Sequence, residues 1–324
     1  MAKTSLNQRL KRLQELETED DSPELRAVLR SALQDDSNRV VAKAAEIVGQ
    51  RELIEFRDEL RSLWPRFLSD PLESDKGCHA KTAILDALSQ LGFDDPDFYL
   101  DGIRFRQLEP GWPKASDTAI NLRGSSAFAL ARSHLIGLRS KLIALTDLLA
   151  DSERLARVHA VNALVDVGHD SVIPLLRVKA RCGDGEAEVT GACLAGLLRL
   201  DLRESIPFVG QFLHGSESVV CEAAVALGEC NHGDAVALLI QALDRTEESD
   251  LQESLLVAIG LSRHPSALDF LIGTLSPHTN FSEVGLRALA PSRFYPGIRE
   301  RIEQAVRDSQ SRRLMALFED AFRL

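Results

Sequence analysis

The amino-acid sequence predicts an all-α fold, an α-α superhelix of about eight helical-pair repeats with capping helices at both ends of the array. Three observations lead to this prediction. One pattern of apolar and small residues recurs every 30 to 42 residues along the 324-residue chain. Within each copy the apolar positions follow the spacing of an amphipathic helix. Strand and hairpin signals are nearly absent.

The repeating pattern is clearest in residues 151–168, which read DSERLARVHAVNALVDVG. If Asp151 is position 0, small residues stand at positions 9 and 12 and an aliphatic residue at position 13. The pairs at positions 12 and 13 of the eight copies are Ile47-Val48, Ala87-Leu88, Ala129-Leu130, Ala163-Leu164, Gly196-Leu197, Ala226-Leu227, Ala258-Ile259 and Ala288-Leu289. Each copy predicts one helix of about four turns, which we call a B helix. A second amphipathic segment lies between successive copies, and we call it an A helix.

Aspartate occupies position 0 in the first five copies, where a carboxylate can cap the free N–H groups at the start of a B helix. Three of these residues are followed by a cation at position 6. We expect a structural ladder in which each Asp pairs with a basic side chain of its own or an adjacent repeat; an enzymatic Asp-Arg pair is the alternative. The residues of the expected ladder are Asp75, Lys81, Asp117, Arg123, Asp151 and Arg157.

The pattern resembles the HEAT repeat, in particular the short HEAT-like variety that is also found in phycobilin lyases. The best-matching residues are Asp151, Arg157, Ala160, Ala163, Leu164 and Gly168. The resemblance covers roughly residues 20–310 and implies a HEAT-like solenoid. It says little about function, because the family includes scaffolds, adaptors, lyase subunits and a few DNA-repair enzymes.

Three segments organise the chain. We expect residues 1–22 to form an N-terminal capping helix, because an array end must present a polar face to water. Residues 23–290 hold the repeats, and residues 291–324 read as C-terminal capping helices. The aromatic residues near the C-terminus either close the array or dock a partner.

Residues 93–116 form an aromatic insertion. It begins with an expected A helix at residues 96–108 and ends with a stiff loop at residues 109–116. Rigid aromatic side chains on loops lose little entropy on binding. The candidate partner-binding residues of this region are Trp112, Arg104 and Arg106. Alternatively, Trp112 folds back over an irregular seam between repeats.

Positions 4, 7, 11 and 15 of the B helices face away from the expected core, and in arrays of this kind they line the concave side. The stripe begins polar and then becomes apolar. Its apolar members are Phe128, Leu155, Val158, Cys221, Val225, Val257 and Leu261. A contiguous apolar run predicts a site for a protein or peptide. The alternative is that tight curvature buries these positions.

Charge is unevenly distributed along the chain. Residues 184–290 contain 16 acidic and 5 basic residues, which accounts for the whole formal net charge of −11. An acidic surface attracts a basic peptide or protein and repels phosphate backbones, so we do not expect a nucleic-acid partner. The alternative is that the acidic residues serve only solubility.

The common signatures of enzymes and cofactor sites are missing from the sequence. It contains no GxxxxGK, GxGxxG, GxSxG or HExxH motif, so we expect no catalytic residue and no cofactor. Five cysteines without a CxxC pair argue against a disulfide framework and a structural zinc site, and we expect no metal. The absence of a signal-like or membrane-spanning segment predicts a cytoplasmic protein.

We therefore expect a non-enzymatic scaffold or adaptor that binds a protein or peptide on the concave face. The first alternative is a lyase or chaperone-like subunit that handles a tetrapyrrole, as the resemblance to phycobilin lyases implies. The remote alternative resembles the HEAT-like DNA glycosylases, for which the local ingredients are Trp112, Arg104, Arg106 and Asp117.

Overall fold

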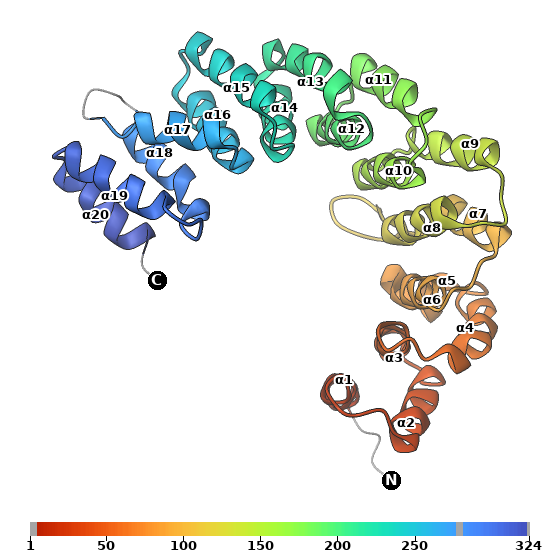
Figure 1. The fold of residues 1–324 in the computed structure, drawn as a ribbon. Helices are drawn as coiled ribbons and strands as arrows, with labels where there is room; N and C mark the ends of the chain where they lie inside the picture. The colour runs from red at the N-terminus through yellow and green to blue at the C-terminus, as the bar shows by residue number, and fades with distance from the viewer. Residues whose placement is uncertain (1–4, 277–280, 323–324) are drawn as a thin grey trace. The chain divides into compact units, whose positions relative to one another are not determined.

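The computed structural model describes residues 5–276 and 281–322, and its regular structure is almost entirely helical (Figure 1). The predicted all-α fold of helical pairs is confirmed, because every one of the eight expected B helices is present. They are α3 (Asn38–Gln50), α6 (His79–Gln90), α8 (Ile120–Arg132), α10 (Arg154–Val167), α12 (Ala187–Leu200), α14 (Glu217–Glu229), α16 (Ser249–Ser262) and α18 (Ser282–Leu289).

The chain divides into two compact units, and the first comprises Met1–Val167. Its B helices α3, α6, α8 and α10 contact one another in succession. Each also packs against an A helix on its outer side (Figure 1). These A helices are α2 (Pro23–Leu33), α4 (Arg57–Leu63), α7 (Pro96–Arg104) and α9 (Leu138–Leu148). Helix α1 (Leu6–Leu16) packs on α3 through the buried Leu13 and Leu16.

The second unit, Gly168–Leu324, repeats this arrangement with B helices α12, α14, α16 and α18 in sequential contact. Its A helices are α11 (Val172–Cys182), α13 (Leu202–Gly210), α15 (Gly233–Arg245) and α17 (Pro265–Gly273). Helices α19 (Ile298–Asp308) and α20 (Arg312–Ala321) follow. The rings of Phe318 and Phe322 stack and are buried, so these aromatics lie in the core of the C-terminal helices.

Short helical turns complete both units. They are η1 (Ile54–Phe56), η2 (Trp64–Phe67), α5 (Pro71–Ser74) and η3 (Lys76–Cys78) in the first unit, and η4 (Gln211–His214) and η5 (Ala290–Ser292) in the second. Helix α5 and η3 occupy the lengthened connection between α4 and α6.

Small residues allow neighbouring B helices to approach to backbone contact. A methyl group added to Gly228 of α14 would lie 2.3 Å from the carbonyl oxygen of Ala258 on α16. One added to Gly260 would lie 2.6 Å from the carbonyl oxygen of Ala288 on α18. The small positions of the repeat therefore set the distances between stacked helices.

The aromatic insertion differs from the prediction. The helix expected at residues 96–108 ends at Arg104, and β1 (Leu108–Glu109) pairs antiparallel with β2 (Ser116–Asp117). The cause is long-range hydrogen bonding by Gln107. Its N–H donates to the Asp117 carboxylate at 3.2 Å, and its carbonyl oxygen accepts from the Thr118 N–H at 2.9 Å. These bonds replace the helical ones, so the expected loop is the tip of a hairpin.

Candidate partner-binding surface

The apolar residues expected to line the concave side lie on one face of the B helices. Positions 4, 7, 11 and 15 of the repeat share that face, because residues three and four apart are neighbours on a helix. Within each unit, we call the surface formed by these positions the B-helix face. Position 8 borders it.

In the second unit, the B-helix face exposes three apolar side chains. Val225 on α14 and Val257 and Leu261 on α16 are 36–45% exposed. Cys221, one turn before Val225, is half-buried. Since α14 and α16 pack side by side, these residues belong to one surface. The packing of the array does not bury them.

Carboxylates surround these apolar side chains. Helices α14 and α16 contain Glu217, Glu222, Glu229, Asp250 and Glu253 but no Lys or Arg. Glu222, Glu229 and Glu253 form no ion pair with any residue that the structure describes. Burial and then repulsion by Glu188 raise the pKa of Glu222. This part of the face therefore attracts cations.

In the first unit, the apolar part of the face lies on α8 and α10. Leu155 is exposed, whereas Val158 and Phe128 are half-buried. The Phe128 ring meets the His159 ring edge-on, with 6.2 Å between centroids. Burial lowers the pKa of His159, which favours the neutral imidazole and keeps this patch weakly polar.

The remainder of the face in the first unit forms a polar cleft of about 390 Å³ between α1, α3, α6 and the start of α8. Arg39, Glu46, His79 and Asp86 line it. Burial and then repulsion by Glu46 raise the pKa of Asp86, although a hydrogen bond from Ser125 opposes the change. The first unit therefore combines a polar and an apolar surface region.

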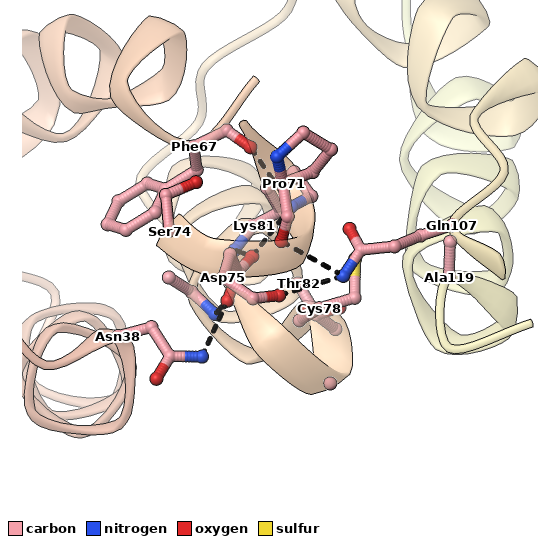
Figure 2. Close-up of polar contacts among 12 residues, drawn as sticks. Asn38, Phe67, Pro71, Ser74, Asp75, Cys78, Lys81, Thr82, Gln107 and Ala119 are labelled. Atoms are coloured by element: carbon pink, nitrogen blue, oxygen red, sulfur yellow. Dashed lines mark hydrogen bonds and ion pairs between the residues drawn. The ribbon is translucent and has the colours of Figure 1, made fainter. Parts of the chain in front are cut away.

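Asp75 and Lys81 are fully buried at the start of α6, with 2.9 Å between carboxylate oxygen and ammonium nitrogen (Figure 2). The Asp75 carboxylate also accepts hydrogen bonds from the N–H groups of Ala80 and Lys81, at 2.8 and 3.0 Å. Lys81 donates to the carbonyl oxygen of Phe67. The pair caps α6 and ties it to the preceding insertion.

Arg123 of α8 is buried between two carboxylates. It lies 2.7 Å from Asp117 of its own repeat and 3.2 Å from Asp151 of the next. Arg106 contacts the Asp151 carboxylate at 2.5 Å, while Arg157 donates to the Asp151 carbonyl oxygen at 2.9 Å. These contacts join two repeats within the first unit, so the geometry suits a structural role.

Trp112 stands at the tip of the β1–β2 hairpin and is 95% exposed, so it does not cover a seam between repeats. The base of the hairpin is fixed by the buried Glu109. Its carboxylate accepts from Gly77 N–H, Gln107 Nε2 and Thr118 Oγ1 at 2.6 to 2.8 Å. Burial raises the pKa of Glu109, but these hydrogen bonds outweigh burial and the net pKa is lowered. A well-anchored base thus presents an exposed indole.

Sequence reasoning missed Glu109 and Gln107. Gly77, which donates to Glu109, and Asp75, whose carbonyl oxygen accepts from Gln107, are each 32 residues away in a different insertion. The only available signal was the place of Glu109 and Gln107 beside the turn-forming residues 110–113, which indicate a turn but no partner.

The glycosylase ingredients do not form one site in the structure. Asp117 is buried, and burial would raise its pKa. Hydrogen bonds from Ala119 N–H, Gln107 N–H and Arg123 outweigh this effect and lower the pKa. Trp112 lies at the exposed hairpin tip, and Arg104 is exposed at the end of α7. Asp117 therefore serves the start of α8.

Within residues 5–276 and 281–322, no three His, Cys, Asp or Glu side chains are grouped as metal ligands. No helix in these ranges has the length and apolar character needed to cross a bilayer. All five cysteines are free, and burial raises the pKa of both Cys78 and Cys193 to about 12.

The class of protein is a helical-pair repeat protein, and comparison with known families agrees with this class. A family model described as PBS lyase HEAT-like repeat matches residues 219–245, which hold most of α14 and all of α15. The HEAT-like interpretation is confirmed for this segment. No curated protein matches the sequence.

Several solved structures resemble this chain, among them the following three. The complex of CpcE and CpcF of phycocyanin lyase from a Nostoc species is 17% identical, with 90% of this chain and 96% of that chain covered and a TM-score of 0.36. Human deoxyhypusine hydroxylase in complex with glycerol is 21% identical, with coverages of 80% and 91% and a TM-score of 0.30. An engineered protein is 14% identical, with coverages of 99% and 95% and a TM-score of 0.38.

Proposed function

We propose that this protein is a non-enzymatic scaffold or adaptor that holds a protein or peptide partner on the B-helix face. The observation that carries the proposal is the set of exposed apolar side chains at equivalent repeat positions. The set comprises Leu155 in the first unit and Val225, Val257 and Leu261 in the second, with the half-buried Phe128, Val158 and Cys221 beside them. Exposed apolar side chains that cluster on one surface, as those of α14 and α16 do, mark interaction sites.

Two further features support this function. The carboxylates of α14 and α16 favour a basic partner over a nucleic acid. The anchored hairpin offers Trp112 as an accessory contact, with Arg104 and Arg106 exposed nearby in the sequence. In this proposal, the buried ladder residues form the frame that positions the face. The five free cysteines favour a reducing compartment, the cytoplasm.

A pull-down from the native host tests the proposal. The bait is the native chain, the Leu155→Glu plus Val225→Glu variant, or a matched control, Ile143→Glu plus Val178→Glu. The control residues are also exposed and lie on the A helices α9 and α11, one in each unit. Circular dichroism verifies that all three chains are folded. We expect the control to retain the partner proteins and the Leu155→Glu plus Val225→Glu variant to lose them. Equal recovery of partner proteins by the two variants would refute the proposal.

A second candidate function is a subunit that handles a tetrapyrrole. The observation in its favour is the match of residues 219–245 to the PBS lyase HEAT-like repeat. Mixing the chain with a linear tetrapyrrole and recording absorbance after gel filtration tests it. A changed spectrum with pigment retained on the protein supports this candidate, whereas unchanged spectra and free pigment exclude it.

A further inference from the structure

Three equivalent positions form an apolar row in the second unit. Ala195, Val225 and Val257 all occupy position 11 of their repeats, on α12, α14 and α16. These helices contact one another in succession, and Figure 1 shows them side by side. Packed helices lie about 8–10 Å apart. The row therefore offers one small or branched apolar contact about every 10 Å.

Carboxylates stand beside this row on α14 and α16. Glu222 precedes Val225 by one turn of α14, and Glu229 follows it by one turn. Glu253 precedes Val257 by one turn of α16. Within the described ranges these three carboxylates have no cationic partner. A ligand lying along the row would thus meet apolar contacts under its axis and negative charge at its flanks where it crosses α14 and α16, whereas the cation Arg199 follows Ala195 on α12.

We infer that the ligand of this row is a basic amphipathic α-helix that crosses α12, α14 and α16, with an apolar residue at every seventh position and Lys or Arg on both flanks. The inference rests on the proposed function and specifies the partner of the same face. Residues i and i+7 of a helix are about 10.5 Å apart and share one face, which matches the step of the row. In a strand, residues of one face recur about every 6.6 Å, which does not match.

Binding of synthetic peptides to the full chain tests the inference by fluorescence anisotropy. The probe is a peptide of about 18 residues with Leu at three heptad-spaced positions and Lys on both flanks, long enough to span three helices. One comparison peptide carries Glu in place of Lys, and another has the same composition with the Leu spacing broken. We expect both comparison peptides to bind at least about tenfold more weakly than the probe. We also expect rising salt to weaken the binding of the probe.

Protein variants locate the binding. Glu229→Lys plus Glu253→Lys should weaken binding of the probe peptide about tenfold and strengthen binding of the comparison peptide that carries Glu. The matched control is Glu204→Lys plus Asp244→Lys, which changes net charge equally at exposed positions of the A helices α13 and α15. The control should change the dissociation constant less than about twofold.

The outcomes separate this inference from the proposed function. No binding, equal binding of the three peptides, or equal effects of the two double variants would overturn the inference. If the pull-down nevertheless depends on Leu155 and Val225, the proposed function stands and only the basic helix is wrong. Sedimentation of the chain alone tests whether a second copy of the chain occupies the row. A dimer that Val225→Ser abolishes would assign the row to this second copy and overturn the inference.

Discussion

Arg123 is a fully buried cation whose charge is balanced by Asp117 and Asp151. Removal of one member from a buried ion pair leaves an uncompensated charge, which costs much more than the loss of an exposed pair. Helix α8 contains both cases, because Arg132 at its end pairs with Asp166 while 66% exposed.

We predict that Arg123→Ala lowers the free energy of unfolding by about 3–5 kcal/mol. Arg132→Ala on the same helix should cost only about 0–1 kcal/mol. Urea unfolding followed by circular dichroism measures both. Similar losses for the two variants would show that the buried network contributes no more than a surface ion pair.

Removing the charge of Asp86 should stabilise the protein, whereas removing that of Arg123 should destabilise it. Burial, then Glu46, holds the pKa of Asp86 above its ordinary value of 3.8, so its ionisation at neutral pH costs stability. The fold binds the proton of Asp86 more tightly than the unfolded chain does. The stability that this contributes is present below pH 3.8 and is lost as the pH rises through the pKa of Asp86 in the folded state. Asp86→Asn should therefore be more stable than the native chain at pH 7, and the difference should shrink on acidification.

The control for this measurement is Asp101→Asn at an exposed position of α7. It should change the free energy of unfolding by less than about 0.5 kcal/mol at either pH. A destabilised Asp86→Asn variant at pH 7 would contradict the assignment.

Local spacing explains why some site residues could be predicted. Asp75 with Lys81 and Asp117 with Arg123 are six residues apart, so one helical turn and its cap bring each pair together. The second partner of Arg123, Asp151, depends on how the next repeat packs. Glu109 and its contacts lie outside the repeat, so no periodic signal identifies them.

The contact between α14 and α16 is set by a missing side chain at Gly228. Alanine there would gain about 1 kcal/mol of helix propensity. Its methyl group would lie 2.3 Å from the Ala258 carbonyl oxygen, and the backbone cannot yield cheaply. The steric cost of a methyl group between the two helices therefore exceeds the gain in helix propensity.

We predict that Gly228→Ala destabilises the protein by about 1–3 kcal/mol. The control is Gly273→Ala at the end of α17, where nothing lies within 4 Å of the added methyl group. That variant should be stabilised by about 0.4–1 kcal/mol. Thermal unfolding distinguishes the two signs, and stabilisation of Gly228→Ala would contradict the tight seam.

Periodicity predicted the B helices well because each one repeats the same pattern of buried positions. It failed between Phe105 and Asp117, where two short strands pair and no repeated pattern exists. A helix was expected over residues 96–108, but hydrogen bonds with Asp117 and Thr118 determine the conformation of Gln107. A pattern of neighbouring residues does not show which separate segments of the chain will pair, so it did not predict these strands.

The distribution of charge over the whole chain leads to a prediction about nucleic acid. Residues 184–290 carry the entire net charge of −11, and binding to a duplex requires clustered cations. We expect no shift of a labelled DNA duplex in about 50 mM salt, where electrostatic attraction is strong. A shift that disappears at higher salt would contradict the proposed preference for a basic protein partner.

The repeat separates the side chains that hold the fold from those that face solvent. On α14, Ala223, Ala226 and Leu227 are buried, whereas Val225 among them is exposed. Substitution at position 11 of one helix can therefore alter what the protein recognises while neighbouring helices keep their packing. Evolution can revise such a surface one helix at a time, and a protein engineer can redirect it in the same way.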